Sequence, residues 1–131
     1  MKEDLILSTA NIAPLSHWIT PNIESRRFDT RFFIAYLPEK QIVQHDGMEL
    51  TQSLWINPNK AVDMAFKGEM QMIMPTIKNL QSCSEFTVAK DMLDSQKRLT
   101  KKDIPPILPK FFKENGNWVG LLPGDDGYED H

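Results

Sequence analysis

The chain has 131 residues, of which 40% are hydrophobic and 25% charged, so we expect an ordinary globular protein with one modest core, a single domain over residues 1–131. The formal net charge of −3 disfavours non-specific nucleic-acid binding, because a phosphate-binding surface needs a basic excess. No apolar run approaches the roughly 20 residues of a membrane-spanning helix, so no membrane contact is expected.

The N-terminal part predicts a helix followed by a hairpin. Residues 3–13 are typical of a short amphipathic helix, which Pro14 closes. Residues 17–20 (HWIT) are predicted to be a strand, and a turn at residues 21–25 leads to a second strand at residues 28–37. The two strands are expected to pair as a hairpin.

The second strand of this hairpin changes character along its length. From Phe32 onward both faces are apolar, which predicts a central strand covered on two sides. Before Phe32 one face is polar, so this end is expected at a wet rim or a cleft. The sequence of this polar end is RRFDTR.

The middle of the chain predicts a strand and then helices. Residues 49–56 (ELTQSLWI) are expected to form the next strand. Asn57 is a good N-cap with Pro58 at the first helical position, and Gly68 supplies the C-terminal stop. A further helix is predicted from Thr76. The spacing of Ser82 and Glu85 is that of a capping box and predicts the start of a last helix. Its inward-facing side chains are expected to be Phe86, Ala89, Met92 and Leu93.

The C-terminal part predicts extended structure. Three prolines restrict residues 104–112 to an edge or an irregular crossing. Asn115 and Gly116 then predict a type I′ turn between two strands. The acidic tail, residues 123–131, is expected to be flexible.

The single cysteine, Cys83, cannot form a disulfide within the chain, which favours a reducing compartment and hence a cytoplasmic protein. We interpret Cys83 as a packed helix residue and not as a nucleophile. The three histidines show no metal-ligand spacing, so His17, His45 and His131 are interpreted as structural or exposed.

Arginines gather at the polar end of the second strand. Arg26, Arg27 and Arg31 offer planar guanidinium groups that suit phosphates and carboxylates. Asp29 shares a strand face with Arg27 and Arg31, so it could hold their guanidiniums in place. Two interpretations stay open: an anion-binding rim for a diphosphate or a CoA-like ligand, and a salt-bridged strand end that fixes the hairpin.

A series of short motifs resembles the C-terminal half of one subfamily of Nudix hydrolases, which contains the peroxisomal acyl-CoA diphosphatases of animals and their bacterial relatives. The motifs are HWITP, RRFDTRFFIAYLP, SLWINPNKA, KGEM and LPGD-x-x-Y, and they extend from about His17 to Tyr128. The resemblance implies an α/β (α+β) fold, a Nudix-like mixed sheet with flanking helices, here an incomplete sandwich. It also implies hydrolysis of a diphosphate-linked CoA or nucleotide derivative with Mg²⁺ or Mn²⁺.

The defining Nudix box, G-x5-E-x7-R-E-x-x-E-E-x-G, is not found in these 131 residues. In the family this box precedes the segment matched here, and its glutamates hold the metal ions. Glu49 matches a position where some Nudix enzymes place a water-activating carboxylate, so it is the candidate catalytic base; a solvated carboxylate at the start of a strand is the alternative interpretation, and both stay open. Asp46 and Glu49 alone are a poor substitute for the box, because hydrated divalent ions need several convergent oxygens. Asp46 is also interpreted as an Asx-turn residue.

Two functional hypotheses follow, and a third interpretation, a decayed gene product with no function of its own, also stays open. In the first, the chain is equivalent to the C-terminal part of a Nudix domain and is not catalytic alone, binding no metal by itself. In the second, it is a non-catalytic module that binds a nucleotide, CoA or a protein partner. In either case the open strand edge of half a sandwich invites pairing, so we expect a homodimer or a complementing chain.

Overall fold

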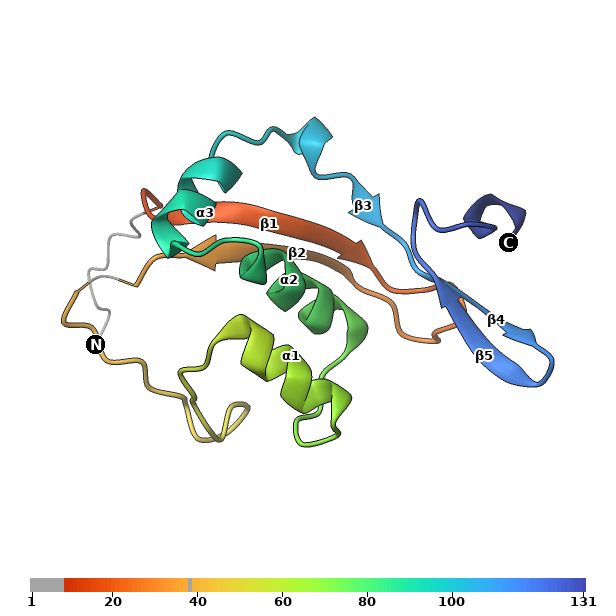
Figure 1. Cartoon of the computed structure of the whole chain (residues 1–131), viewed down its shortest axis with the longest axis horizontal. Coiled ribbons are helices and arrows are strands. Elements are labelled where there is room, and N and C mark those ends of the chain that lie inside the picture. The colour runs from red at the N-terminus through yellow and green to blue at the C-terminus, as the bar shows by residue number, and fades with distance from the viewer. Residues whose placement is uncertain (1–8, 38) are drawn as a thin grey trace. The chain divides into compact units, whose positions relative to one another are not determined.

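The computed structural model describes residues 9–37 and 39–131, which carry both helices and strands (Figure 1). The chain divides into two compact units. Of the described residues, one unit contains 9–12, 35–37 and 39–95, and the other contains Ala13–Ile34 and Gln96–His131. This α+β content, with two small sheets and three α-helices, is the class that the sequence predicted.

The larger sheet is mixed and contains the predicted hairpin. Strands β1 (Ile12–Ile19) and β2 (Asp29–Ala35) run in opposite directions (Figure 1), and β1 also pairs in parallel with the two-residue strand β3 (Pro106–Ile107). The order β2-β1-β3 makes β1 the central strand and β2 an edge strand. The prediction that β2 is a central, two-sided strand is therefore wrong, and Phe33 on it is 58% exposed.

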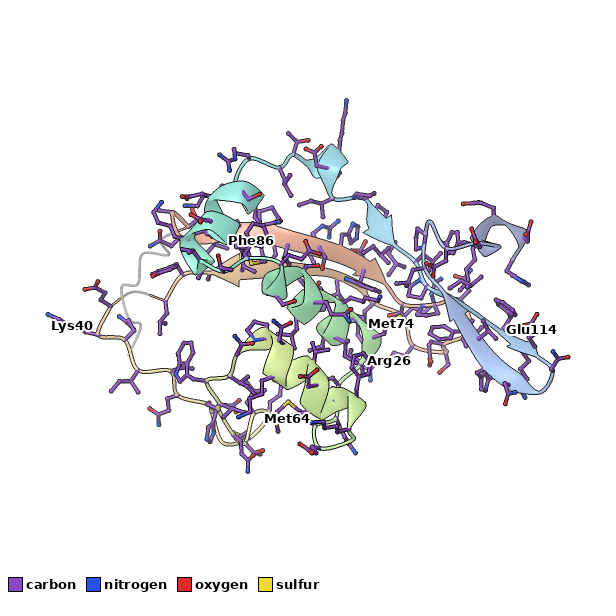
Figure 2. All side chains as sticks on the ribbon, in the orientation of Figure 1. Arg26, Lys40, Met64, Met74, Phe86 and Glu114 are labelled. Carbon is purple, nitrogen blue, oxygen red and sulfur yellow. The ribbon has the colours of Figure 1, made fainter. Side chains whose placement is uncertain are left out.

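A second hairpin follows in the same unit. Strands β4 (Lys110–Glu114) and β5 (Asn117–Leu121) pair in antiparallel register, and Glu114 lies at the end of β4 beside the turn (Figure 2). Asn115 and Gly116 both have positive φ, 49° and 84°. A type I′ turn requires positive φ at both central positions, so the Asn-Gly prediction is confirmed.

The C-terminal residues contact this hairpin. Tyr128 is buried and donates its hydroxyl hydrogen to the carbonyl oxygen of Leu108 at 2.8 Å. The Lys110 ammonium donates to the Tyr128 carbonyl oxygen at 2.8 Å and lies 4.0 Å from the centre of its ring. The ring of His131 stacks on Phe112 with 3.6 Å between centroids. The flexibility predicted for residues 123–131 stays a prediction, because contacts alone measure no motion.

The other unit holds helices α1 (Pro58–Phe66), α2 (Met74–Ser84) and α3 (Ala89–Gln96), of which α1 packs against α2. The side chain of Asn57 accepts the N–H of Asn59 at 2.9 Å, which confirms the predicted N-cap. Gly68 has φ +75°, as a helix C-terminal glycine does. None of the described helices has the length and apolar character needed to cross a membrane.

Three expectations about local structure are wrong. Residues 49–56 form no strand, although their side chains favour one. Ile12 and Ala13 belong to β1 and not to a helix, and residues 1–8 of that predicted helix lie outside the described part. Ser82 begins no helix: its hydroxyl donates to the Lys78 carbonyl oxygen at 3.1 Å inside α2. A serine side chain that hydrogen-bonds to a carbonyl oxygen of its own helix does not cap the start of the next helix.

Candidate functional site

The first hairpin places three polar side chains together. His17 lies on β1, and Asp29 and Arg31 lie on β2. Because side chains alternate along a strand, Asp29 and Arg31 share one face of β2. His17 lies on the central strand of the sheet, opposite Pro106 of β3, and β2 lies on the other side of β1.

Asp29 is the centre of this cluster, which we call the His17–Asp29–Arg31 cluster. Its Oδ1 lies 2.7 Å from His17 Nε2 and 3.2 Å from Arg31 Nη1. The His17 side chain is only 15% exposed, whereas Asp29 and Arg31 are 55% and 57% exposed. Exposed ion pairs contribute only about 0–1 kcal/mol to folding. The Asp29–Arg31 pair therefore contributes little to the stability of the hairpin, and its guanidinium is exposed to solvent.

The two other arginines have different partners. Arg27 donates Nε–H to the carbonyl oxygen of Thr20 at 3.0 Å. Thr20 also closes the hairpin, because its N–H donates to the Phe28 carbonyl oxygen and its hydroxyl accepts the Phe28 N–H, both at 2.9 Å. Arg26, on the loop between β1 and β2 (Figure 2), has its guanidinium carbon 5.6 Å from the centre of the Phe28 ring. A guanidinium at this distance makes a cation–π contact.

The structure thus brings together part of the predicted arginine group. Asp29 contacts Arg31, as the strand alternation suggested, but the described contact of Arg27 is with Thr20. His17, which we interpreted from the sequence as structural or exposed, contacts Asp29. Its partner is twelve positions away, so only the pairing of the two strands could have indicated this contact. Whether these residues bind a substrate remains a prediction.

The candidate carboxylates Asp46 and Glu49 lie in the other unit, in the irregular segment 39–57. Oδ1 of Asp46 accepts the N–H groups of Met48 at 3.0 Å and Leu50 at 2.9 Å, which is the Asx-type geometry expected from the sequence. The hydrogen bonds from Leu50 and then Met48 hold the pKa of Asp46 below its usual value. Glu49 is exposed, and its role as a base stays a prediction.

These residues do not by themselves fit a divalent cation. Within residues 9–37 and 39–131, no three His, Cys, Asp or Glu side chains gather closely enough to hold one. Mg²⁺ and Mn²⁺ prefer several convergent oxygen ligands, and Oδ1 of Asp46 already accepts two backbone hydrogens. No reaction step through a metal is therefore assigned to the described residues.

Cys83 lies half-buried in α2. Burial raises the pKa of its thiol above the usual value, because a low-dielectric environment disfavours the thiolate. The thiolate is the nucleophilic form, so this environment does not activate Cys83.

Comparison with known proteins gives curated relatives but no matching family model and no matching solved structure. The acyl-coenzyme A diphosphatase NUDT19 of Xenopus laevis is 28% identical over 117 residues, covering 86% of this chain and 31% of that protein. Its human counterpart is 28% identical over 115 residues, with the same coverage. The chain is related to Nudix hydrolases.

A third relative extends this similarity. The putative nudix hydrolase 7 of Caenorhabditis elegans is 27% identical over 144 aligned residues, which cover 99% of this chain and 47% of that protein. The chain therefore spans about a third to a half of the length of the Nudix relatives it matches. The activities of those whole proteins belong to them, and for this chain they motivate a proposal.

Proposed function

We propose that the chain supplies the substrate-binding part of a Nudix-type diphosphatase that acts on a CoA ester or another nucleoside-diphosphate derivative. The proposal is carried by the His17–Asp29–Arg31 cluster, which presents an oriented and exposed guanidinium. The similarity to acyl-CoA diphosphatases over 86% of the chain supports the choice of ligand class.

Three arginines on one hairpin suit such a ligand. Arg26, Arg27 and Arg31 all come from residues 26–31, and each has a distinct local contact. A guanidinium binds phosphate oxygens through two parallel N–H donors, so one or two fixed arginines can select a diphosphate. In this proposal Asp29 orients Arg31 and does not contact the ligand.

Catalysis in this proposal needs metal-binding carboxylates in addition to those of the described residues. Mg²⁺ or Mn²⁺ held by Nudix-box glutamates would neutralise charge on the phosphoryl group, with Glu49 as the candidate base. We propose that the 131-residue chain alone does not turn over substrate. The test is incubation with Mn²⁺ and an acyl-CoA, followed by chromatography of the released monophosphates. Turnover well above a metal-only blank would contradict inactivity.

Binding is tested separately from turnover. Calorimetric titration of the chain with CoA is expected to give a measurable Kd, and Arg31→Ala or Arg27→Ala is expected to weaken it about tenfold. Lys60→Ala is a matched control, because it removes an exposed cation from α1, in the other unit. An equal loss in Lys60→Ala would indicate non-specific charge attraction, and no binding by the wild type would refute the proposal.

A second candidate, a binding module without catalysis, is favoured by one observation. The His17–Asp29–Arg31 cluster and Arg27 all come from residues 17–31, so anion binding by them needs no carboxylate from the irregular segment 39–57. The Mn²⁺ assay distinguishes the two, provided the Nudix box is supplied by a separately expressed segment of a relative. Turnover on mixing supports the enzyme; CoA binding without turnover supports the module.

The proposal includes association with a second copy of the chain or with a chain that bears the missing box. Phe33 on the edge strand β2 is 58% exposed, and several apolar side chains of segment 39–57 are exposed as well. An open strand edge with apolar neighbours favours pairing. Sedimentation velocity at micromolar concentration is expected to show a dimer, and a compact monomer would contradict association with itself.

A further inference from the structure

Two donors converge on a single oxygen of Asp29. His17 Nε2 and Arg31 Nη1, which come from neighbouring strands, both lie within 3.2 Å of Oδ1. An ionised carboxylate can only accept hydrogen bonds, so Nε2 of His17 carries the proton that it shares with Asp29. The 2.7 Å separation is typical of a charge-assisted hydrogen bond, which is stronger than one between neutral groups.

The three members of the cluster are not equally buried. His17 is mostly buried and lies on the central strand, opposite Pro106 of β3. Asp29 and Arg31 are more than half exposed and lie on the edge strand. An exposed Asp–Arg pair alone is weak, because ordering a long arginine side chain costs rotamer entropy. His17 is therefore the most buried member of the cluster, and Asp29 connects it to Arg31.

We propose that His17 is a positioning residue: through Asp29 it holds the Arg31 guanidinium in the orientation that receives a phosphate oxygen of the ligand. This inference rests on the proposed function for the identity of the ligand. Asp29 occupies one edge of the guanidinium through Nη1, and a guanidinium has five N–H donors, so further donors remain for an anion. His17 acts without touching the ligand.

A purely structural role makes a different prediction. If His17 only fastens the hairpin, its loss lowers stability and leaves the residual order of the Arg31 side chain unchanged. If His17 positions Arg31, the order of the guanidinium depends on the donor at Nε2. Glutamine can place an N–H donor near the position of histidine Nε2, and leucine cannot. The pair His17→Gln and His17→Leu thus separates the donor from the shape of the side chain.

The experiment measures ¹⁵N relaxation of the Arg31 Nε–H in the ligand-free protein, together with the Kd for CoA and the melting temperature. His17→Leu is expected to make the Arg31 side chain more mobile and to weaken CoA binding by a factor of about five. His17→Gln is expected to retain both properties. Thr30→Val is the matched control, because Thr30 lies between Asp29 and Arg31 on the opposite face of β2.

The outcomes are distinguishable. If Arg31 keeps its order in His17→Leu, or if His17→Gln is as impaired as His17→Leu, the positioning role is overturned. If His17→Leu does not fold, Asp29→Asn replaces it. Loss of the negative charge should make the Arg31 side chain more mobile, and an unchanged mobility would again overturn the inference. If the wild type binds no CoA, the proposed function fails, while the ligand-free relaxation still decides whether His17 orders Arg31.

Discussion

The hairpin of β1 and β2 and the irregular segment 39–57 differ in structure although both sequences favour strands. Residues 49–56 (ELTQSLWI) are as suited to a strand as β2, yet they adopt no regular structure. In the hairpin the pairing partner follows after a short loop, and Thr20 closes the loop by bonding to Phe28. Among the described strands, none pairs with residues 49–56. Strand propensity is therefore realised only where a partner strand is near.

The largest expected effect is a difference between two tryptophans. Trp18 on β1 is 4% exposed and donates Nε1–H to Ser16 Oγ at 3.0 Å, whereas Trp55 in the irregular segment is 78% exposed. Trp18→Ala should lower the free energy of unfolding by about 3–5 kcal/mol, because it removes a large buried side chain. Trp55→Ala should change it by less than about 0.5 kcal/mol.

Urea denaturation followed by circular dichroism measures both variants. Trp118→Ala is the control on the second hairpin, where the side chain is 62% exposed. If Trp55→Ala is as destabilising as Trp18→Ala, the irregular segment is packed and the contrast between the two regions is wrong.

The second prediction compares two glycines with positive φ. Gly116 (φ +84°) is in the β4–β5 turn, and Gly47 (φ +72°) is in the irregular segment; a Cβ at either would meet no atom within 4 Å. Gly116→Ala should cost about 1–2 kcal/mol, because the left-handed conformation is required by the paired strands on both sides. Gly47→Ala should cost less, because its segment has no strand pairing to preserve. Thermal melting of both variants measures these losses of stability. Equal losses would contradict the predicted difference between the turn and the irregular segment.

The third prediction concerns the end of the irregular segment, where Asn57 begins α1. Asn57→Ala should lower the free energy of unfolding by about 1 kcal/mol, because the N–H of Asn59 loses its acceptor. Asn59→Ala is the matched control, since it keeps the Asn57 acceptor and the backbone N–H, and its effect should be a few tenths of a kcal/mol. Equal losses of stability in the two variants would refute the cap as the cause.

Local signals predicted the elements that residues specify through near neighbours. The Asn57 cap, the Asn115–Gly116 turn and the burial of Met92 and Leu93 on α3 were predicted correctly, because each depends on positions within a few residues, whereas Ala89, predicted to face inward, is exposed. The strand at residues 49–56 was wrongly predicted, because pairing is a non-local requirement. The edge position of β2 also depends on which strands reach it, which its own apolar residues cannot specify.

The candidate site follows the same rule. The contact of Asp29 with Arg31 was readable from strand alternation, because the two residues are two positions apart. The contact of His17 with Asp29 was not, because it depends on how two strands pair across twelve residues. The partner of Arg27 is a backbone carbonyl, that of Thr20, and residue types alone carry no signal for it.

The smallest expected effect on stability is at Asp46, an exposed residue of the irregular segment that makes local hydrogen bonds. Hydrogen bonds from the N–H groups of Leu50 and Met48 lower the pKa of the Asp46 carboxyl from its usual 3.8. A lowered pKa means that the carboxylate form stabilises the turn. That stabilisation is present above pH 3.8 and is lost as the pH falls through the lowered pKa.

A carboxyl ¹³C titration of Asp46 by NMR should therefore show a midpoint below 3.8, and a midpoint at or above that value would contradict the turn. Asp46→Ala should shift the amide signals of Met48 and Leu50 without lowering the melting temperature, because the carboxylate is fully exposed. Asp46→Asn, which keeps an acceptor oxygen, should retain those signals. If the melting temperature of Asp46→Ala falls as far as that of Asn57→Ala, the turn is coupled to the helices, and segment 39–57 is no longer the loosely ordered counterpart of the hairpin.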